Sequence, residues 1–217
     1  MPQALLLIVI VAVIIGVVSL YCLYIKKRRE ALSALAKEIG LSYSPKDLFN
    51  IPRKFGHLSM FQHGDSRRAY DVLFGEKDGA EVYIFNYIYY TGSGKNRHAH
   101  TFTNCVLRGK DRFPYLILRP ESFLDKMASF IGFDDIDFES AKFSKKFFVK
   151  SRDRKFAYDV IHPQMMEFLL AVSNINVEIG EREFLFHFNR TLIISEWASL
   201  CKIGFDFIGK IPNYAGK

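Results

Sequence analysis

The sequence predicts an α+β protein with an N-terminal transmembrane helix followed by a soluble domain, in which helices pack on an antiparallel sheet. Residues 4–25 form an uncharged and mainly aliphatic run. After it, segments rich in β-branched and aromatic residues alternate with segments whose apolar residues recur every three or four positions. The 21 Phe and 11 Tyr residues are sufficient for a sizeable hydrophobic core.

The N-terminal run is long enough to span the lipid bilayer. At about 1.5 Å per residue it extends about 33 Å as a helix, and the hydrocarbon core is about 30 Å thick. A cleaved signal peptide would need a basic start and a shorter apolar core, whereas the chain begins with Met1, Pro2 and Gln3. We therefore expect residues 1–25 to be an uncleaved transmembrane anchor.

Four basic residues follow the span directly: Lys26, Lys27, Arg28 and Arg29. Basic residues that flank a span are retained on the cytoplasmic side. The sequence thus predicts a single-pass protein of the inner (cytoplasmic) membrane, with its N-terminus outside and its C-terminal domain in the cytosol. The three cysteines are few and widely spaced, which suits a reducing compartment.

A basic and amphipathic helix is predicted within residues 26–44. Its apolar residues recur at steps of three and four: Leu32, Leu35 and Ile39. The Gly40-Leu41 step is typical of a helix end. The helix should leave the membrane as a short stalk and then pack on the domain. Residues 44–52 are predicted to be an irregular connection.

The first part of the soluble domain is predicted to be a β-meander closed by a helix. Its strands are residues 67–74, 80–91, 101–107 and 115–119. The first two strands are joined by residues 75–79, whose Asp-Gly step is a hairpin signal. The second strand is apolar or aromatic on both faces, so it should lie inside the sheet. Residues 91–100 form a polar loop, and residues 120–132 form the closing helix.

The second part of the soluble domain is predicted to repeat this arrangement. It comprises a strand at 143–151, a helix from 162, a hairpin of 175–179 with 184–188, and a helix at 191–208. One stripe of the last helix is apolar: Ile193, Trp197, Leu200, Gly204 and Phe207. Residues 45–217 thus form the soluble domain, with two similar lobes at 45–133 and 134–217, and the sequence leaves open whether these are separate domains.

Residues 137–170 carry a pattern of aromatic, acidic and small residues. Its positions are Phe138, Glu139, Ser140, Phe143, Phe147, Val149, Asp153, Ala157, Tyr158, Pro163, Met165, Met166 and Glu167. The pattern resembles the signature region of an uncharacterised bacterial family of membrane-anchored proteins, classed only as a domain of unknown function. The resemblance extends more loosely to the basic helix and to residues 64–75. It implies a bacterial membrane protein and carries no activity.

The net charge of +7 resides wholly in the part of the chain after the span. A basic domain beside an anionic leaflet gains electrostatic attraction. The polar loop adds Lys95, Arg97 and His98 to the four basic residues after the span. These seven residues are the predicted contacts with anionic lipid headgroups or with an acidic protein partner. We expect no nucleic-acid binding, because the remaining charge is spread out and no recognised motif accompanies it.

Three short patterns approach known chemical sites without completing them. The glycine loop at 91–95 lacks the first glycine of a phosphate-binding loop and the Ser or Thr after its lysine. His98, His100 and Cys105 have atoms that can bind a metal but lack a fourth ligand at metal-site spacing. The acidic stretch 134–139 lacks the turn glycine and the terminal Glu of a calcium loop. We expect neither a metal nor another cofactor.

The sequence has no hydrolase signature, because it contains neither a Gly-x-Ser-x-Gly elbow nor a His-Glu-x-x-His pair. Four further histidines are scattered and are predicted to be surface or satisfied core residues: His57, His63, His162 and His187. No residue is nominated as catalytic. The leading hypothesis is a membrane-tethered cytosolic binding or scaffolding domain of unknown specificity. The alternative is an enzyme or small-ligand receptor with a pocket between the two halves, lined by the tyrosines of residues 83–90.

Overall fold

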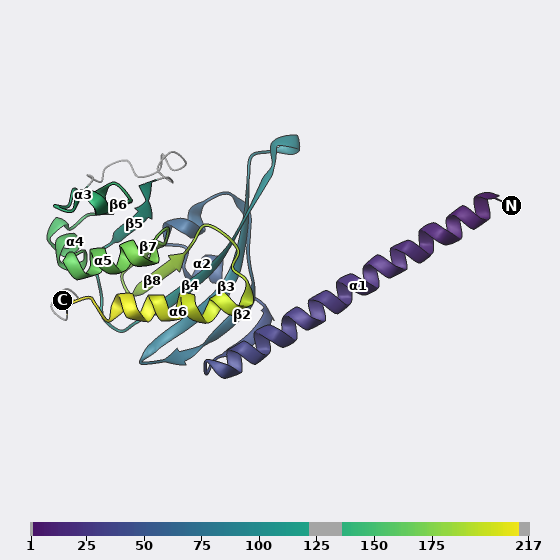
Figure 1. The fold of residues 1–217 in the computed structure, drawn as a ribbon, viewed down its shortest axis with the longest axis horizontal. Coiled ribbons are helices and arrows are strands. Elements are labelled where there is room, and N and C mark those ends of the chain that lie inside the picture. The colour runs from purple at the N-terminus through teal and green to yellow at the C-terminus, as the bar shows by residue number, and fades with distance from the viewer. Residues whose placement is uncertain (1, 122–135, 213–217) are drawn as a thin grey trace.

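The computed structural model describes residues 2–121 and 136–212, and it consists of a long helix that projects from a sheet-based domain (Figure 1). The strands are β1 (Ser42–Lys46), β2 (Asp65–Lys77), β3 (Ala80–Thr91), β4 (His98–Arg108), β5 (Leu116–Pro120), β6 (Phe147–Ser151), β7 (Asn176–Ile179) and β8 (Glu183–His187). The helices are α1 (Pro2–Glu38), α2 (Ile51–Lys54), η1 (Ser59–Gln62), η2 (Gly94–Asn96), α3 (Ala141–Ser144), α4 (Arg154–Val160), α5 (Pro163–Val172) and α6 (Ile194–Ile208). The predicted α+β class is confirmed.

All eight strands form one antiparallel sheet in the order β1-β2-β3-β4-β8-β7-β5-β6. The predicted β-meander is therefore wrong, because β5 pairs with β6 and β7 instead of β4. Strand β8 is buried along its whole length, so it needs a neighbour on each side and occupies the place beside β4. The chain reaches β5 by passing round the β7–β8 turn, where Gly109 N–H donates to Arg182 O at 2.9 Å. The helix expected at 120–132 lies outside the described residues, except for its first two positions.

Helix α1 continues without a break from the apolar run to Glu38, as the sequence predicts. Its apolar part is long enough to cross a membrane and is not buried against the domain. Its last turns pack on the sheet, where Leu32 and Ala36 are fully buried. Leu41 N–H donates to Ala36 O at 2.7 Å, so the helix ends in the predicted glycine-capped turn. The predicted continuation of the helix past the apolar run and its packing on the domain are confirmed.

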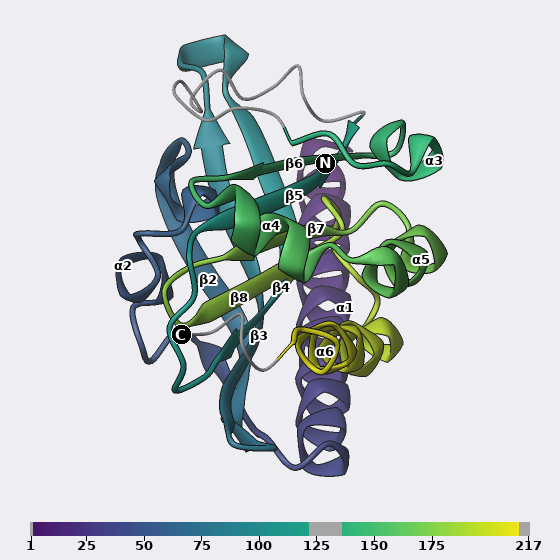
Figure 2. The same cartoon turned by 90° about the vertical axis from the view of Figure 1, so that its left-hand side faces the viewer.

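Strand β3 lies inside the sheet, as predicted, and separates two hydrophobic clusters. Val82 and Ile84 belong to the larger cluster, which contains buried residues of α1, α4, α5 and α6. Tyr83 and Phe85 belong to the smaller cluster, which is covered by α2 and η1. Figure 2 shows α2 on one side of the sheet and α1, α5 and α6 on the other. Helices therefore cover both faces of the sheet.

The β2–β3 hairpin has a tighter turn than predicted. Only Asp78 and Gly79 lie between the strands, both with positive φ, 49° and 80°. A two-residue turn of this kind matches the twist of its strands, so both strands continue up to it. Residues 75–77 belong to β2 and not to a loop. Similarly, β4 begins at His98, so the predicted polar loop shrinks to residues 92–97.

Three further boundaries differ from the prediction. Residues 42–46 form the edge strand β1, which takes in the end of the region predicted as helix (26–44) and the start of the predicted irregular connection (44–52); an edge position tolerates Pro45. The strand predicted at 143–151 begins only at Phe147, because Ser140 Oγ accepts from Phe143 N–H at 3.3 Å and starts α3. Ile193 precedes α6 and is exposed, so it does not belong to the buried stripe of that helix.

Candidate functional site

The junction between α1 and the sheet is closed by an ion pair. Arg28 Nε donates to Asp71 Oδ2 at 2.9 Å, and Tyr43 OH donates to Asp71 Oδ1 at 2.9 Å. The two charged side chains are only 19% and 10% exposed. Asp71 has a φ of 53° and lies at a bulge of β2, which turns its side chain toward α1. Arg28 is therefore engaged with the domain, whereas Lys26, Lys27 and Arg29 are exposed.

The tip of the β3–β4 hairpin carries the other predicted contact residues. It extends beyond the sheet toward the same side as the N-terminal end of α1 in both views (Figures 1 and 2). Lys95 and His98 are exposed there. Arg97 is held in place, because its Nη2 donates to Asp65 Oδ1 at 2.6 Å and its guanidinium lies 4.3 Å from the centre of the Tyr90 ring. The tip thus presents three exposed groups, of which the Arg97 guanidinium is held by Asp65 and Tyr90.

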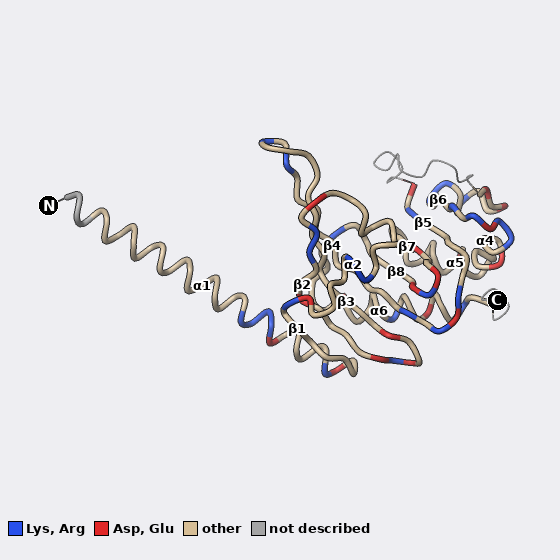
Figure 3. The backbone as a smooth tube through the Cα atoms, turned by 180° about the vertical axis from the view of Figure 1, so that it is seen from behind, with Lys and Arg blue, Asp and Glu red and all other residues tan. Residues whose placement is uncertain are grey.

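Basic residues also occur elsewhere on the domain, as Figure 3 shows. The two groups of predicted contact residues differ from these other basic residues in their position. One group lies where α1 enters the domain, and the other lies at the hairpin tip. The structure does not bring them into contact. His100, the other histidine of the tip, bonds Thr91 Oγ1 at 2.7 Å and stacks on Tyr89. Among the described residues no group of His, Cys, Asp and Glu side chains is arranged to hold a metal ion.

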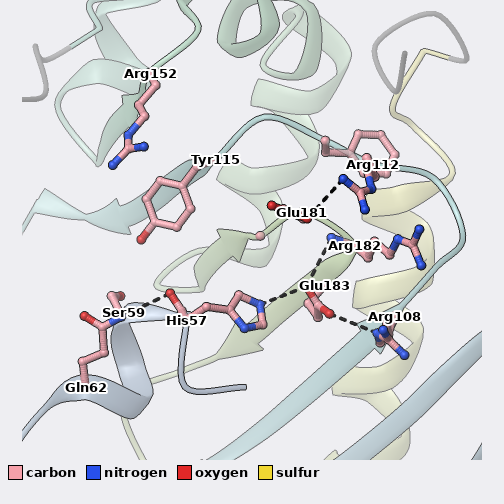
Figure 4. A pocket seen from close by; sticks show the side chains of 12 residues that line it. His57, Ser59, Gln62, Arg108, Arg112, Tyr115, Arg152, Glu181, Arg182 and Glu183 are labelled. Carbon is pink, nitrogen blue, oxygen red and sulfur yellow. Dashed lines mark hydrogen bonds and ion pairs between the residues drawn. The ribbon is translucent and has the colours of Figure 1, made fainter. Parts of the chain in front are cut away.

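A polar pocket of about 730 Å³ lies where η1, the β7–β8 turn and the start of β5 meet (Figure 4). Arg152 and Tyr115 lie across the pocket from Ser59 and Gln62. The β7–β8 turn supplies Arg182 and two carboxylates. Because the turn and η1 are more than a hundred residues apart in the sequence, no local motif could have revealed this pocket.

Two carboxylates of the pocket region are fully engaged with donors from the protein. Glu183 accepts from His57 Nε2 and Arg108 Nε, both at 3.0 Å, and from the Arg182 N–H at 3.2 Å. The buried Glu178 accepts from Ser59 N–H and Oγ at 2.6 Å and from Tyr115 OH at 2.7 Å. These bonds fix η1 to the far end of the sheet.

The titration of Glu183 and His57 follows from this arrangement. Burial acts to raise the pKa of Glu183, but the hydrogen bonds from His57, the Arg182 N–H and Arg108 outweigh it and lower the pKa to about 2. The hydrogen bond to Glu183 raises the pKa of His57, against the opposing effect of burial. Ser59 Oγ donates to the buried Glu178 and accepts from Arg119 Nη2 at 3.0 Å.

A His57→Gln variant is expected to lose stability mainly at and below neutral pH. A raised folded-state pKa gives stability that is present below about 6.5 and is lost as the pH rises through the folded value. Because His57 is half exposed, the loss should stay under about 1 kcal/mol. Denaturation at pH 6 and pH 9, followed by the fluorescence of the single Trp197, measures it. An equal loss at both pH values would contradict the assignment.

The tyrosines of residues 83–90 do not line one common pocket. Tyr83 OH donates to Glu81 and receives a hydrogen bond from Lys54 Nζ at 2.5 Å. Tyr87 is fully buried in the smaller hydrophobic cluster. Tyr89 alone of these residues lines a second cavity, formed by residues from both halves of the chain. That cavity also contains His63 and His187.

Comparison with known proteins supports the fold and gives no family. No protein-family model and no curated protein sequence matches the chain, so the resemblance of residues 137–170 stays a prediction. The chain is similar in structure to the mycobacterial trehalose monomycolate transport factor A, TtfA, in its crystal structure. The TM-score is 0.59 at 14% sequence identity, over 85% of this chain and 90% of that one. At this identity the two proteins share their fold.

Proposed function

We propose that the protein is a non-enzymatic binding or scaffolding domain that α1 tethers to the cytoplasmic face of the inner membrane. The observation that carries the proposal is the continuity of α1. Its apolar part projects into free space, and its last turns lie in the hydrophobic core with Leu32 and Ala36. A single rigid helix would then hold the domain at a fixed height and orientation above the bilayer.

The hairpin tip is the second support. With α1 in the membrane, the tip points toward the bilayer surface, because it leaves the sheet on the same side as the apolar end of α1 (Figures 1 and 2). Exposed Lys95 and His98 at the tip, and exposed Lys26, Lys27 and Arg29 on α1, would each meet the headgroup region. Attraction to an anionic leaflet is worth about 1 kcal/mol per basic residue. We infer a two-point contact with anionic headgroups.

The shared fold with a transport factor favours one role among scaffolds. We propose that the domain assists a membrane transport system of the cell envelope by holding a partner protein at the membrane.

A photo-crosslinking experiment on the full chain tests this placement. A photoreactive lysine analogue at position 95 is expected to form adducts with lipid or with a membrane protein in native membranes. The matched control is position 155, an exposed lysine on α4 at the far end of the domain from α1. Adducts of lipid or of one recurrent membrane protein that form at 95 at least tenfold more than at 155 would support the tether model. Equal yields at both positions would overturn it.

A further inference from the structure

A second cavity, of about 480 Å³, lies at the base of the β3–β4 hairpin. It is bounded by the end of η1, the hairpin, β5 and the end of β8. Gly64 brings the η1 side close to the hairpin, since its φ is +61° and a Cβ there would lie 2.2 Å from Tyr90 O. Only glycine permits this approach. The volume is within the range of about 300–1,000 Å³ that is usual for small-ligand sites.

One end of the cavity is polar and rich in hydrogen-bond donors. Arg119 of β5, His187 of β8 and Asn189 meet there. The Asn189 N–H donates to His187 Nδ1 at 3.3 Å, so the hydrogen of the neutral ring is on Nε2. The side-chain Nδ2 of Asn189 is buried and has no hydrogen-bond partner among the described residues. The polar end therefore offers an amide N–H, an imidazole N–H and a guanidinium.

This end of the cavity carries one cationic side chain. Arg119 is the charged residue among the described residues that line the cavity, and no Asp or Glu of residues 2–121 and 136–212 lines it. Arg119 Nη2 donates to Ser59 Oγ at 3.0 Å, and Ser59 Oγ donates to Glu178, the buried carboxylate whose charge acts on Arg119. Both His63 and His187 are kept neutral by burial and by the charge of Arg119, which lower their pKa values. Donors around one cation favour an anion.

The other end of the cavity is aromatic and apolar. The rings of Tyr89 and His100 are stacked, with centroids 4.9 Å apart and planes at 16°. The Phe102 ring lies 6.0 Å from that of Tyr89 and 5.8 Å from that of His187, so it connects the two ends. Met60, which is buried, adds a flexible apolar side chain. This end can accept a flat ring or a short alkyl chain.

We propose that this cavity binds a small anionic amphiphile, a carboxylate or phosphate group joined to an apolar body. The anionic group lies against Arg119, His187 and Asn189, and the apolar body lies between Tyr89, Phe102 and Met60. The source of such a molecule is either a membrane lipid or a soluble aromatic or aliphatic acid, which share this chemistry. The proposed site does not depend on the tethering role, because a small molecule can bind in the cavity without a partner protein.

The test is calorimetric titration of the full chain in nanodiscs of zwitterionic phosphatidylcholine, with empty nanodiscs as reference. The probes are 1-naphthoate and decanoate, which represent the soluble and lipid-like sources. Their neutral amides, 1-naphthamide and decanamide, keep the same apolar bodies. At least one acid is expected to bind ten times or more tightly than its amide. A preference for decanoate would indicate a lipid source, and a preference for naphthoate a soluble one.

The second part of the test places a negative charge at the polar end of the cavity. Asn189→Asp keeps the shape of the side chain, and the left-handed φ of 54° suits both residues. It is expected to weaken binding of the acid at least tenfold and to change binding of the amide less than threefold. The matched control is Asn174→Asp, the same substitution at the same φ on the exposed surface. It should leave both affinities unchanged.

Two outcomes would overturn the proposal. One is that neither acid binds at millimolar concentration, which would mean that the cavity holds only water. The other is that each acid binds no more tightly than its amide. If Asn189→Asp fails to fold, as judged by the fluorescence of Trp197, the comparison of acid and amide on the wild-type chain still decides the question. Neither outcome bears on the crosslinking at position 95.

Discussion

Acidification from pH 6.5 to pH 4.5 is expected to lower the free energy of unfolding by about 2 kcal/mol through His187 alone. Burial, assisted by the charge of Arg119, lowers the pKa of this histidine to about 3. An unfolded histidine titrates near 6.5. Between these values the unfolded chain binds one more proton than the folded chain, so stability falls with falling pH. Acidification to pH 3 extends the loss to about 4–5 kcal/mol.

The measurement is denaturant unfolding of the full chain in nanodiscs across this pH range, followed by Trp197 fluorescence. His187→Gln removes the titrating group and should flatten the profile between pH 6.5 and pH 4.5. His63 has a pKa shifted in the same direction, so some slope should remain. The control is His98→Gln, the same substitution at an exposed site. A wild-type slope in His187→Gln would show that the pKa of His187 is not lowered in the folded state.

Asp71→Asn is expected to weaken the docking of α1 by about 2–4 kcal/mol. Asn has nearly the same shape and tolerates the positive φ of this position, so the bulge should persist. The change leaves the Arg28 guanidinium, which is 19% exposed, without its counter-charge. Removal of one partner of a buried pair costs more than the pair contributes, because the remaining charge stays desolvated.

Hydrogen exchange of α1 in nanodiscs is the appropriate measurement for this variant. Residues 28–39 should lose protection, while the buried strands β3 and β8 keep theirs. The matched control is Asp65→Asn, which breaks the exposed pair with Arg97 and should have a much smaller effect. Unchanged protection of residues 28–39 in Asp71→Asn would mean that Leu32 and Ala36 alone hold the helix. Arg28→Met combined with Asp71→Asn should recover part of the loss, since no buried charge is then left unpaired.

The anchoring helix and the local turns were predictable because their signals are local. A long uncharged run needs a helix wherever it lies in lipid. The stripe of Leu32, Leu35 and Ile39, the Gly40-Leu41 step and the Asp78-Gly79 turn each act through residues a few positions apart, and the structure contains all of them. The β7–β8 hairpin and α6 were predicted for the same reason.

The order of the strands and both pockets were decided by tertiary structure. Sequence cannot show that β8 lies beside β4, because the pairing depends on which apolar strand fills the gap, over a separation of about eighty residues. The same holds for Ser59 with Glu178, for His57 with Glu183, and for Asp71 with Arg28. Sequence gives no sign that the pKa values of the scattered histidines are shifted, since the pKa of a histidine depends on burial and on charges from distant segments. The sequence by itself determined the long apolar helix, the composition of the elements and the basic residues that follow the apolar run. Only the fold determined which of those basic residues are engaged, and which neutral histidines and donors converge on a cavity.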